Sequence, residues 1–223
     1  MKEEKVSNEN LHALAKRFAE MFDDDKRVQR LSAEIYRQLA DGQPVTAAAL
    51  AGSLDSTIED VRTAWGKLPS FYIGFDDEGR VIEWLGFGLD GGNNRFRIRG
   101  HAMHAWCAWD ALFLPQIIGD DAQVEANDPE TGAPISLTVS PKGVRIARPA
   151  GTVMTFAIAG MEAFPEFENF SFQKTVFFFI SEDSAAAWVE KNPGPVIISL
   201  EEGFAIGKTA IRAIHPDLLD IAG

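Results

Sequence analysis

Cysteine is nearly absent from this chain: of 223 residues, only Cys107 carries a thiol. A single cysteine excludes an intrachain disulfide, and it excludes a metal cage that one chain would build from several thiolates. Cys107 is therefore either a small buried apolar residue or the centre of a reactive site.

Long apolar runs and positive charge are also scarce. No run of about 18 apolar residues occurs, and residues 1–10 are charged and polar, so the sequence predicts neither a membrane span nor a secretory signal. We therefore expect a cytoplasmic protein that does not bind membranes. With 33 acidic against 21 basic residues the formal net charge is -12, which repels polyanions and argues against nucleic acid as a partner.

The first part of the chain has the pattern of short helices followed by a hairpin. Apolar residues recur at three- and four-residue steps, and Ser53 or Ser56 can cap the last of these segments. The expected helices cover 9–22, 31–39, 44–51 and 57–68. Apolar stretches on both sides of the turn residues 76–79 predict a hairpin. Together they predict a winged-helix-like helical domain over residues 1–88, although its acidic turn disfavours DNA binding.

The second part of the chain is dominated by expected β-strands. The glycine-rich stretch 86–92 predicts a domain boundary, with a second domain over residues 89–223. Residues 101–118 have helical spacing up to Pro115, which marks an end or a kink. Further helices are expected after Ser181 and over 201–214. Strands are expected at 95–98, 124–126, 135–139, 144–147, 153–158, 175–180 and 196–200. The order of elements indicates an α+β fold.

Two segments resemble the organomercurial (alkylmercury) lyase family. Residues 105–115, AWCAWDALFLP, resemble the segment that carries that family's nucleophilic cysteine and catalytic aspartate. Residues 131–141, TGAPISLTVSP, are similar to its strand-turn signature, and the resemblance extends from about Leu31 to Phe204. It implies a small helical N-terminal domain and a mixed β-rich catalytic domain. With the pattern of elements above, the expected fold is a winged-helix-like helical domain followed by a mixed β-sheet domain with flanking helices.

The resemblance also implies a reaction. In that family one cysteine attacks the mercury of an alkyl or aryl mercurial, an aspartate handles the proton delivered to the departing carbon, and a second cysteine completes a dithiolate site. Cys107 and Asp110 occupy the first two positions, and Gln173 stands where the second cysteine is expected. Because an amide is a weak ligand for a soft metal, external thiols are expected to carry the mercuric ion away. No organic cofactor is implied.

The residues around Cys107 support this chemistry on their own. If residues 101–118 form a helix, Cys107 and Asp110 share one face and approach to hydrogen-bonding range. Capture of a carbon-bound soft metal by the thiolate then frees a proton that Asp110 can pass to the leaving carbon. Trp106, Trp109 and Gln173 are the candidate substrate-binding residues, although aromatic side chains at this spacing more often belong to a core.

A transition-metal site is a further candidate. His101, His104, Cys107 and Asp110 recur every third residue, and on a helix one ion can reach two of them comfortably. Cys107, Asp110 and His104 are the candidate metal ligands. Two alternative functions therefore stay open beside the lyase: another small-molecule lyase or hydrolase on the same scaffold, and a non-enzymatic metal-binding protein.

Overall fold

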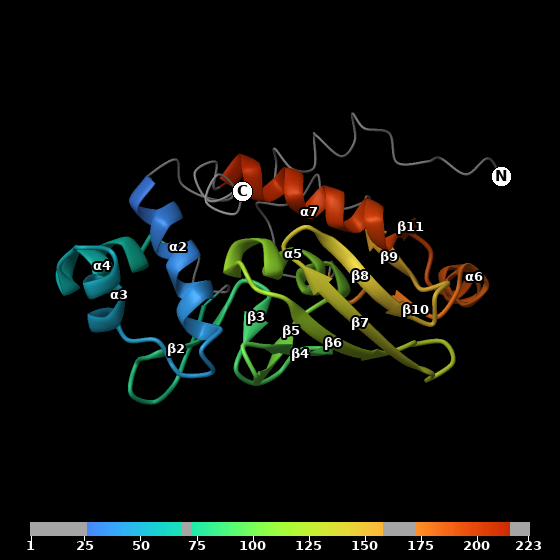
Figure 1. Cartoon of the computed structure of the whole chain (residues 1–223), viewed down its shortest axis with the longest axis horizontal. Helices are drawn as coiled ribbons and strands as arrows, with labels where there is room; N and C mark the ends of the chain where they lie inside the picture. Colours follow the sequence, from blue (N-terminus) through green and yellow to red (C-terminus); the bar gives the residue numbers. More distant parts are fainter. Residues whose placement is uncertain (1–25, 68–72, 158–172, 215–223) are drawn as a thin grey trace.

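The computed structural model describes residues 26–67, 73–157 and 173–214 (Figure 1). The α+β class is confirmed, because helices come first and a large sheet with flanking helices follows. The helix expected over residues 9–22 lies outside the described residues. Within the described ranges, no helix has the length and apolar character needed to cross a bilayer.

Three helices open the described chain, at Lys26–Leu39 (α2), Ala47–Ser53 (α3) and Ile58–Trp65 (α4). The hydroxyl of Thr57 caps α4 by accepting the amide hydrogen of Asp60 at 3.1 Å, so the expectation of Ser53 or Ser56 as the cap is wrong. Thr57 lies directly before the first helical residue, which is where a side-chain oxygen reaches the free amides. Helix α2 buries one apolar face, made of Val28, Leu31, Ile35, Tyr36 and Leu39.

The large sheet has eight strands, and every strand pairing in it is antiparallel, where a mixed sheet was expected. Short connections join many of its neighbouring strands, which is the connection that antiparallel pairs permit. In spatial order the strands are β1 (Ile73–Phe75), β2 (Val81–Trp84), β3 (Phe87–Gly88), β5 (His101–Ala105), β4 (Asn94–Ile98), β6 (Ala122–Asn127), β7 (Pro134–Ser140) and β8 (Gly143–Arg148). The sheet therefore runs across the glycine-rich stretch, and a domain division at residue 88 stays a prediction.

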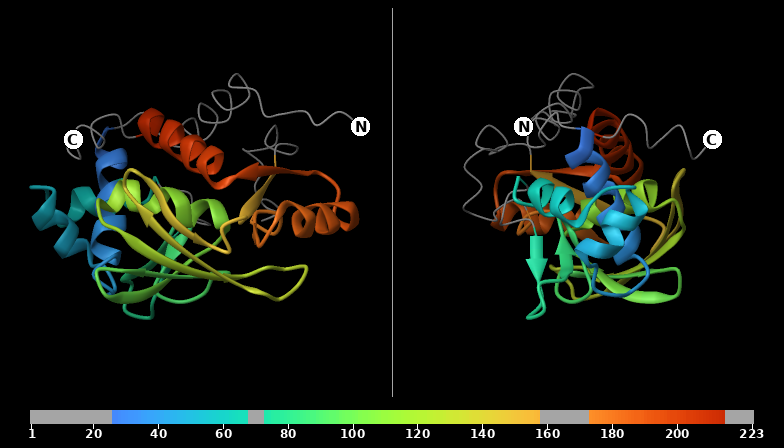
Figure 2. Two further views of the ribbon diagram at one scale, coloured as in Figure 1. Left: turned by 45° about the vertical axis from the view of Figure 1, so that its right-hand side comes forward. Right: turned by 90° about the vertical axis from the view of Figure 1, so that its left-hand side faces the viewer.

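A second, three-stranded sheet places β9 (Val153–Ala157) between β10 (Phe178–Phe179) and β11 (Pro195–Ser199). Helix α6 (Glu182–Lys191) begins after Ser181, whose hydroxyl accepts the Ser184 amide hydrogen at 3.2 Å, so the expected cap is confirmed. Helix α7 (Leu200–Ile214) follows β11 and covers α5 and the strands beside it (Figure 2).

Helix α5 (Ala108–Ile118) forms the centre of the core, and all of its residues are buried. It packs against α2, α7 and the large sheet, and a helix that is apolar all round is expected in such a place. The helix continues through Pro115 and ends at Gly119, whose φ is 91°, so Pro115 is not its end.

The expected helix start at His101 is also wrong. Residues 101–105 form strand β5, which pairs with β4 across a tight turn at Arg99 and Gly100, both with positive φ. Cross-strand hydrogen bonding therefore overrides the helical spacing of the histidines. Helix α5 begins only after Cys107.

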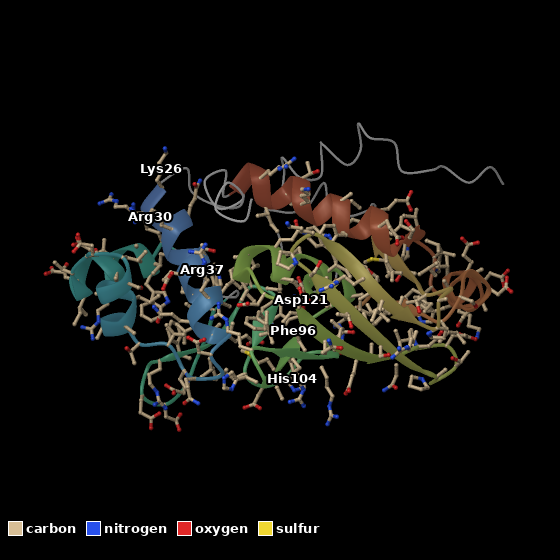
Figure 3. All side chains as sticks on the ribbon, viewed as in Figure 1. Lys26, Arg30, Arg37, Phe96, His104 and Asp121 are labelled. Atoms are coloured by element: carbon tan, nitrogen blue, oxygen red, sulfur yellow. The ribbon has the colours of Figure 1, made fainter. Side chains whose placement is uncertain are left out.

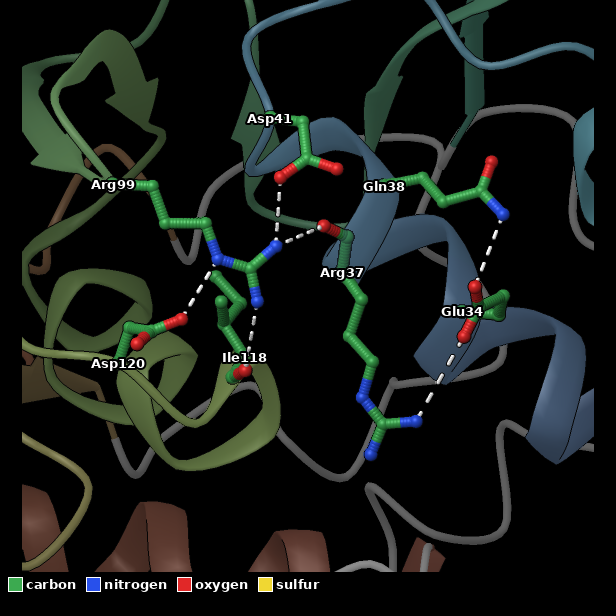
Figure 4. A network of polar contacts seen from close by, with 7 residues as sticks. All are labelled: Glu34, Arg37, Gln38, Asp41, Arg99, Ile118 and Asp120. Carbon is green, nitrogen blue, oxygen red and sulfur yellow. Dashed lines mark hydrogen bonds and ion pairs between the residues drawn. The ribbon is translucent and has the colours of Figure 1, made fainter. Parts of the chain in front are cut away.

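One arginine joins the ends of α2 and α5 (Figure 4). The guanidinium of Arg99 donates to the carboxylates of Asp120 at 2.7 Å and Asp41 at 2.8 Å. It also donates to the carbonyls of Arg37 at 3.0 Å and Ile118 at 3.5 Å, which lie in the last turns of the two helices. Cations are favourable at helix C-termini, so Arg99 holds α2 beside the helix that follows Cys107.

Candidate active site

Cys107 and Asp110 meet at the N-terminus of α5. Cys107 is the N-cap residue, with φ -130° and ψ 174°, and its amide donates to Oδ2 of Asp110 at 2.8 Å. The two residues form a capping box in which a thiol takes the place of the usual hydroxyl. The expected proximity of the pair therefore arises from the cap, and not from a shared helix face, because Cys107 has an extended backbone. The three-residue spacing of a capping box is a signal that the sequence already contained.

Both groups are removed from water: Cys107 is 1% exposed and Asp110 is 8% exposed. Burial raises the pKa of Asp110 to about 7, while hydrogen bonds from Cys107 act in the opposite direction. Burial also raises the pKa of the Cys107 thiol well above its ordinary value, and the Asp110 charge adds to that effect. A carboxyl whose pKa lies near neutrality can take up and release a proton at physiological pH.

The carboxyl of Asp110 lies directly against Gly86. A Cβ added at Gly86 would lie 2.5 Å from Cγ of Asp110, so only glycine leaves room for the carboxyl. The carbonyl of Gly86 accepts the Trp106 amide hydrogen at 2.9 Å, and the carbonyl of Leu85 accepts the Tyr36 hydroxyl at 2.8 Å. Sequence reasoning gave Tyr36 no role in the site and placed Gly86 in a domain boundary, because no local pattern connects residues so far apart in the chain.

The two candidate tryptophans occupy different places. Trp109 is 2% exposed, donates from Nε1 to the carbonyl of Gly203 at 3.1 Å, and makes edge contacts with Phe113 and Phe156 in the core. Trp106 precedes Cys107 and bonds through Nε1 to the carboxylate of Glu83. The backbone of Trp106 is bonded to Gly86, which the Asp110 carboxyl contacts, whereas Trp109 packs in the core. A contact of either with substrate stays a prediction.

The segment that carries Gln173 approaches the start of α5. Gln173 is half-buried and begins a turn over residues 173–175. Three residues later, the carbonyl of Val176 accepts the amide hydrogen of Ala108 at 3.2 Å. This bond brings the segment in which the family's second cysteine is expected next to Ala108, the residue that follows Cys107.

His104 points away from this site. It lies on β5 between the buried residues Met103 and Ala105, so its side chain belongs to the outer face of the sheet (Figure 3). There it lines an open groove together with Arg95 and Glu125. Within the described residues, no group of three or more His, Cys, Asp or Glu side chains is placed to hold a metal ion. The structure therefore does not bring His104 to Cys107, and its role as a metal ligand stays a prediction without geometric support.

Known proteins are similar to this chain in sequence and in fold. The family model described as alkylmercury lyase matches residues 91–212. An alkylmercury lyase of Bacillus cereus is 31% identical over 174 residues, which cover 78% of this chain and 77% of that protein. An alkylmercury lyase of Pseudomonas putida is 32% identical over 183 residues, which cover 82% of this chain and 84% of that protein. A crystal structure of the mercury-bound form of MerB2 superposes with a TM-score of 0.74 at 21% identity, covering 93% of this chain and all of that one. The chain belongs to the alkylmercury lyase family.

Proposed function

We propose that this protein cleaves carbon–mercury bonds by protonolysis, with Cys107 as the nucleophile and Asp110 as the proton donor. The observation that carries the proposal is the buried capping box, which holds a thiol and a carboxyl with a pKa of about 7 in hydrogen-bonding reach of each other. Membership of the alkylmercury lyase family supports the choice of substrate.

The reaction can be written with every atom assigned. The Cys107 thiol gives its proton to the Asp110 carboxylate, and the thiolate displaces the weakly held ligand on an organomercurial substrate. Asp110 then returns the proton to the carbon bound to mercury. The electron pair of the carbon–mercury bond becomes the new carbon–hydrogen bond, the hydrocarbon leaves, and mercury remains as Hg(II) on the Cys107 sulfur. Because burial raises the pKa of the Cys107 thiol, the thiolate forms as the sulfur binds mercury, which takes the place of the proton.

The product must leave without a second protein thiol. In this proposal the Asp110 carboxylate is the other ligand for Hg(II) that the chain offers beside Cys107, and Gln173 orients the substrate or a water from the turn at 173–175. A carboxylate and an amide are hard ligands for a soft metal ion. External small thiols therefore complete the coordination of the mercuric ion and carry it away, and no organic cofactor takes part.

The test is release of benzene from phenylmercuric acetate by purified protein in excess small thiol. We expect turnover that Cys107→Ser and Asp110→Ala each abolish, because one removes the sulfur that binds mercury and the other removes the proton donor. His104→Ala is the matched control, since its side chain lies on the outer face of the sheet, and it should keep its activity. Full turnover in either site variant would refute the assigned roles.

The residue at position 173 gives a second test. Gln173→Cys supplies a thiol on the segment that approaches Ala108, and we expect it to increase the rate of benzene release at limiting external thiol. Ser181→Cys, which places a thiol at the cap of α6, is the control and should have no such effect. An unchanged rate for Gln173→Cys would mean that the missing thiol does not limit the reaction.

A further inference from the structure

The turn between β2 and β3, Leu85–Gly86, packs against the carboxyl of Asp110. Its two residues have positive φ, 28° at Leu85 and 88° at Gly86, so the backbone turns sharply here. Because Gly86 lacks a Cβ, the Asp110 carboxyl lies directly against the backbone of the turn. A shift of this turn would therefore change the position of the carboxyl.

Two hydrogen bonds from opposite sides hold the turn. On one side, the amide of Trp106 donates to the Gly86 carbonyl at 2.9 Å, which ties the turn to the residue before Cys107. On the other side, the hydroxyl of Tyr36 in α2 donates to the Leu85 carbonyl at 2.8 Å. The Tyr36 side chain is 2% exposed, and its ring packs against Trp84 and Phe87, the residues on either side of the turn.

We propose that Tyr36 is a positioning residue for the proton donor: its hydroxyl fixes the Leu85–Gly86 turn and thereby fixes the carboxyl of Asp110. The inference rests on the proposed function for its effect on turnover. Without the hydroxyl, the buried Leu85 carbonyl loses this donor, and the turn can relax away from α2. The carboxyl of Asp110 would then lose its support and its alignment with the mercury-bound carbon.

Tyr36 acts here as a permanent hydrogen-bond donor. Burial, together with the charge of nearby Asp110, raises the pKa of the Tyr36 hydroxyl well above its ordinary value, so the hydroxyl keeps its proton. The hydroxyl donates to the Leu85 carbonyl, which leaves the acid–base chemistry to Asp110 and Cys107. We therefore expect Tyr36 to influence turnover and not the binding of substrate.

The experiment compares Tyr36→Phe with a control one turn away on the same helix. The Ser32 hydroxyl accepts the indole hydrogen of Trp84 at 3.1 Å, a buried bond that also joins α2 to β2 but does not involve the turn. Ser32→Ala therefore removes a similar buried hydrogen bond made by the same helix, to the residue before the turn. Both variants are assayed for kcat and KM with phenylmercuric acetate, at a temperature where thermal unfolding shows both to be folded.

For Tyr36→Phe we expect kcat to fall by about 10- to 100-fold with KM within about twofold of the wild type, the scale of a displaced catalytic group. Ser32→Ala should keep kcat within about threefold of the wild type. Hydrogen exchange of the Trp106 amide gives a readout that does not depend on catalysis. That amide, which donates to Gly86, should exchange faster in Tyr36→Phe than in Ser32→Ala.

Equal kcat values, or equal exchange rates of the Trp106 amide, in the two variants would overturn the inference. Failure of the proposed function has a different signature. In that case the wild type releases no benzene, while the exchange rates still decide whether Tyr36 holds the turn.

Discussion

Replacement of Gly86 by alanine tests the architecture of the site most directly. The added methyl group would lie 2.5 Å from both Cγ and Oδ1 of Asp110, where ordinary contacts begin at 3.4 Å. The carboxyl must therefore move by roughly 1 Å, and a misplacement of that size can cost about 100-fold in rate. The φ of 88° adds backbone strain of roughly 1–2 kcal/mol for any residue with a Cβ.

Gly91→Ala is the matched control, because it has nearly the same strain without the contact. Gly91 has a φ of 83°, and nothing lies within 4 Å of a Cβ added there. Urea denaturation should show a loss of about 1–2 kcal/mol in the free energy of unfolding for Gly91→Ala, and at least as much for Gly86→Ala.

Benzene release from phenylmercuric acetate separates the two variants. Gly86→Ala should lose about 100-fold in kcat, while Gly91→Ala should retain the wild-type value within about twofold. If Gly86→Ala kept the activity of Gly91→Ala, the reasoning would be refuted, since the carboxyl against Gly86 would then not be the group that delivers the proton.

Three further predictions concern pH and stability. The proposed reaction begins with an ionised Asp110 that accepts the Cys107 proton, so kcat/KM should rise as pH rises through the Asp110 pKa of about 7. Because burial raises that pKa, the free energy of unfolding should fall by up to about 4 kcal/mol between pH 3.8 and about 7. Urea titrations of the wild type and Asp110→Asn at several pH values measure this loss of unfolding free energy. The same dependence on pH in both proteins would contradict the role of Asp110 in it. Arg99→Ala should lose about 1–2 kcal/mol in the same assay, whereas Arg95→Ala, whose pair with Glu125 is 3.8 Å long and exposed, should change by less than about 0.5 kcal/mol. Asp128→Ala leaves the four donors of its carboxylate without that acceptor and should lower the free energy of unfolding by about 3 kcal/mol; a loss below about 1 kcal/mol would show that water replaces it.

Much of the fold could be predicted from local pattern. Alternation of apolar residues located β6, β7 and β8 to within two residues at each end, and Ser181 marked the start of α6. Such signals succeed where one face of an element is buried and its ends carry capping side chains. They failed at residues 101–107, where the histidines had helical spacing but pairing with β4 made a strand. A spacing of three residues cannot by itself distinguish a helix from a strand, because the strand is formed by pairing with β4 and that pairing is not visible in the spacing.

The sequence by itself determined the family, the α+β class and the Cys107–Asp110 pair, because these depend on residue identity and on a spacing of three. Only the tertiary structure decided that the Asp110 carboxyl lies against Gly86, in a turn that Tyr36 holds through the Leu85 carbonyl. These contacts join Gly86 to Asp110, 24 positions apart, and Tyr36 to Leu85, 49 positions apart, and they exist only when α2, the β2–β3 turn and α5 pack together. The raised pKa of Asp110 is also decided by the tertiary structure, since it follows from burial of the carboxyl, which no local pattern specifies.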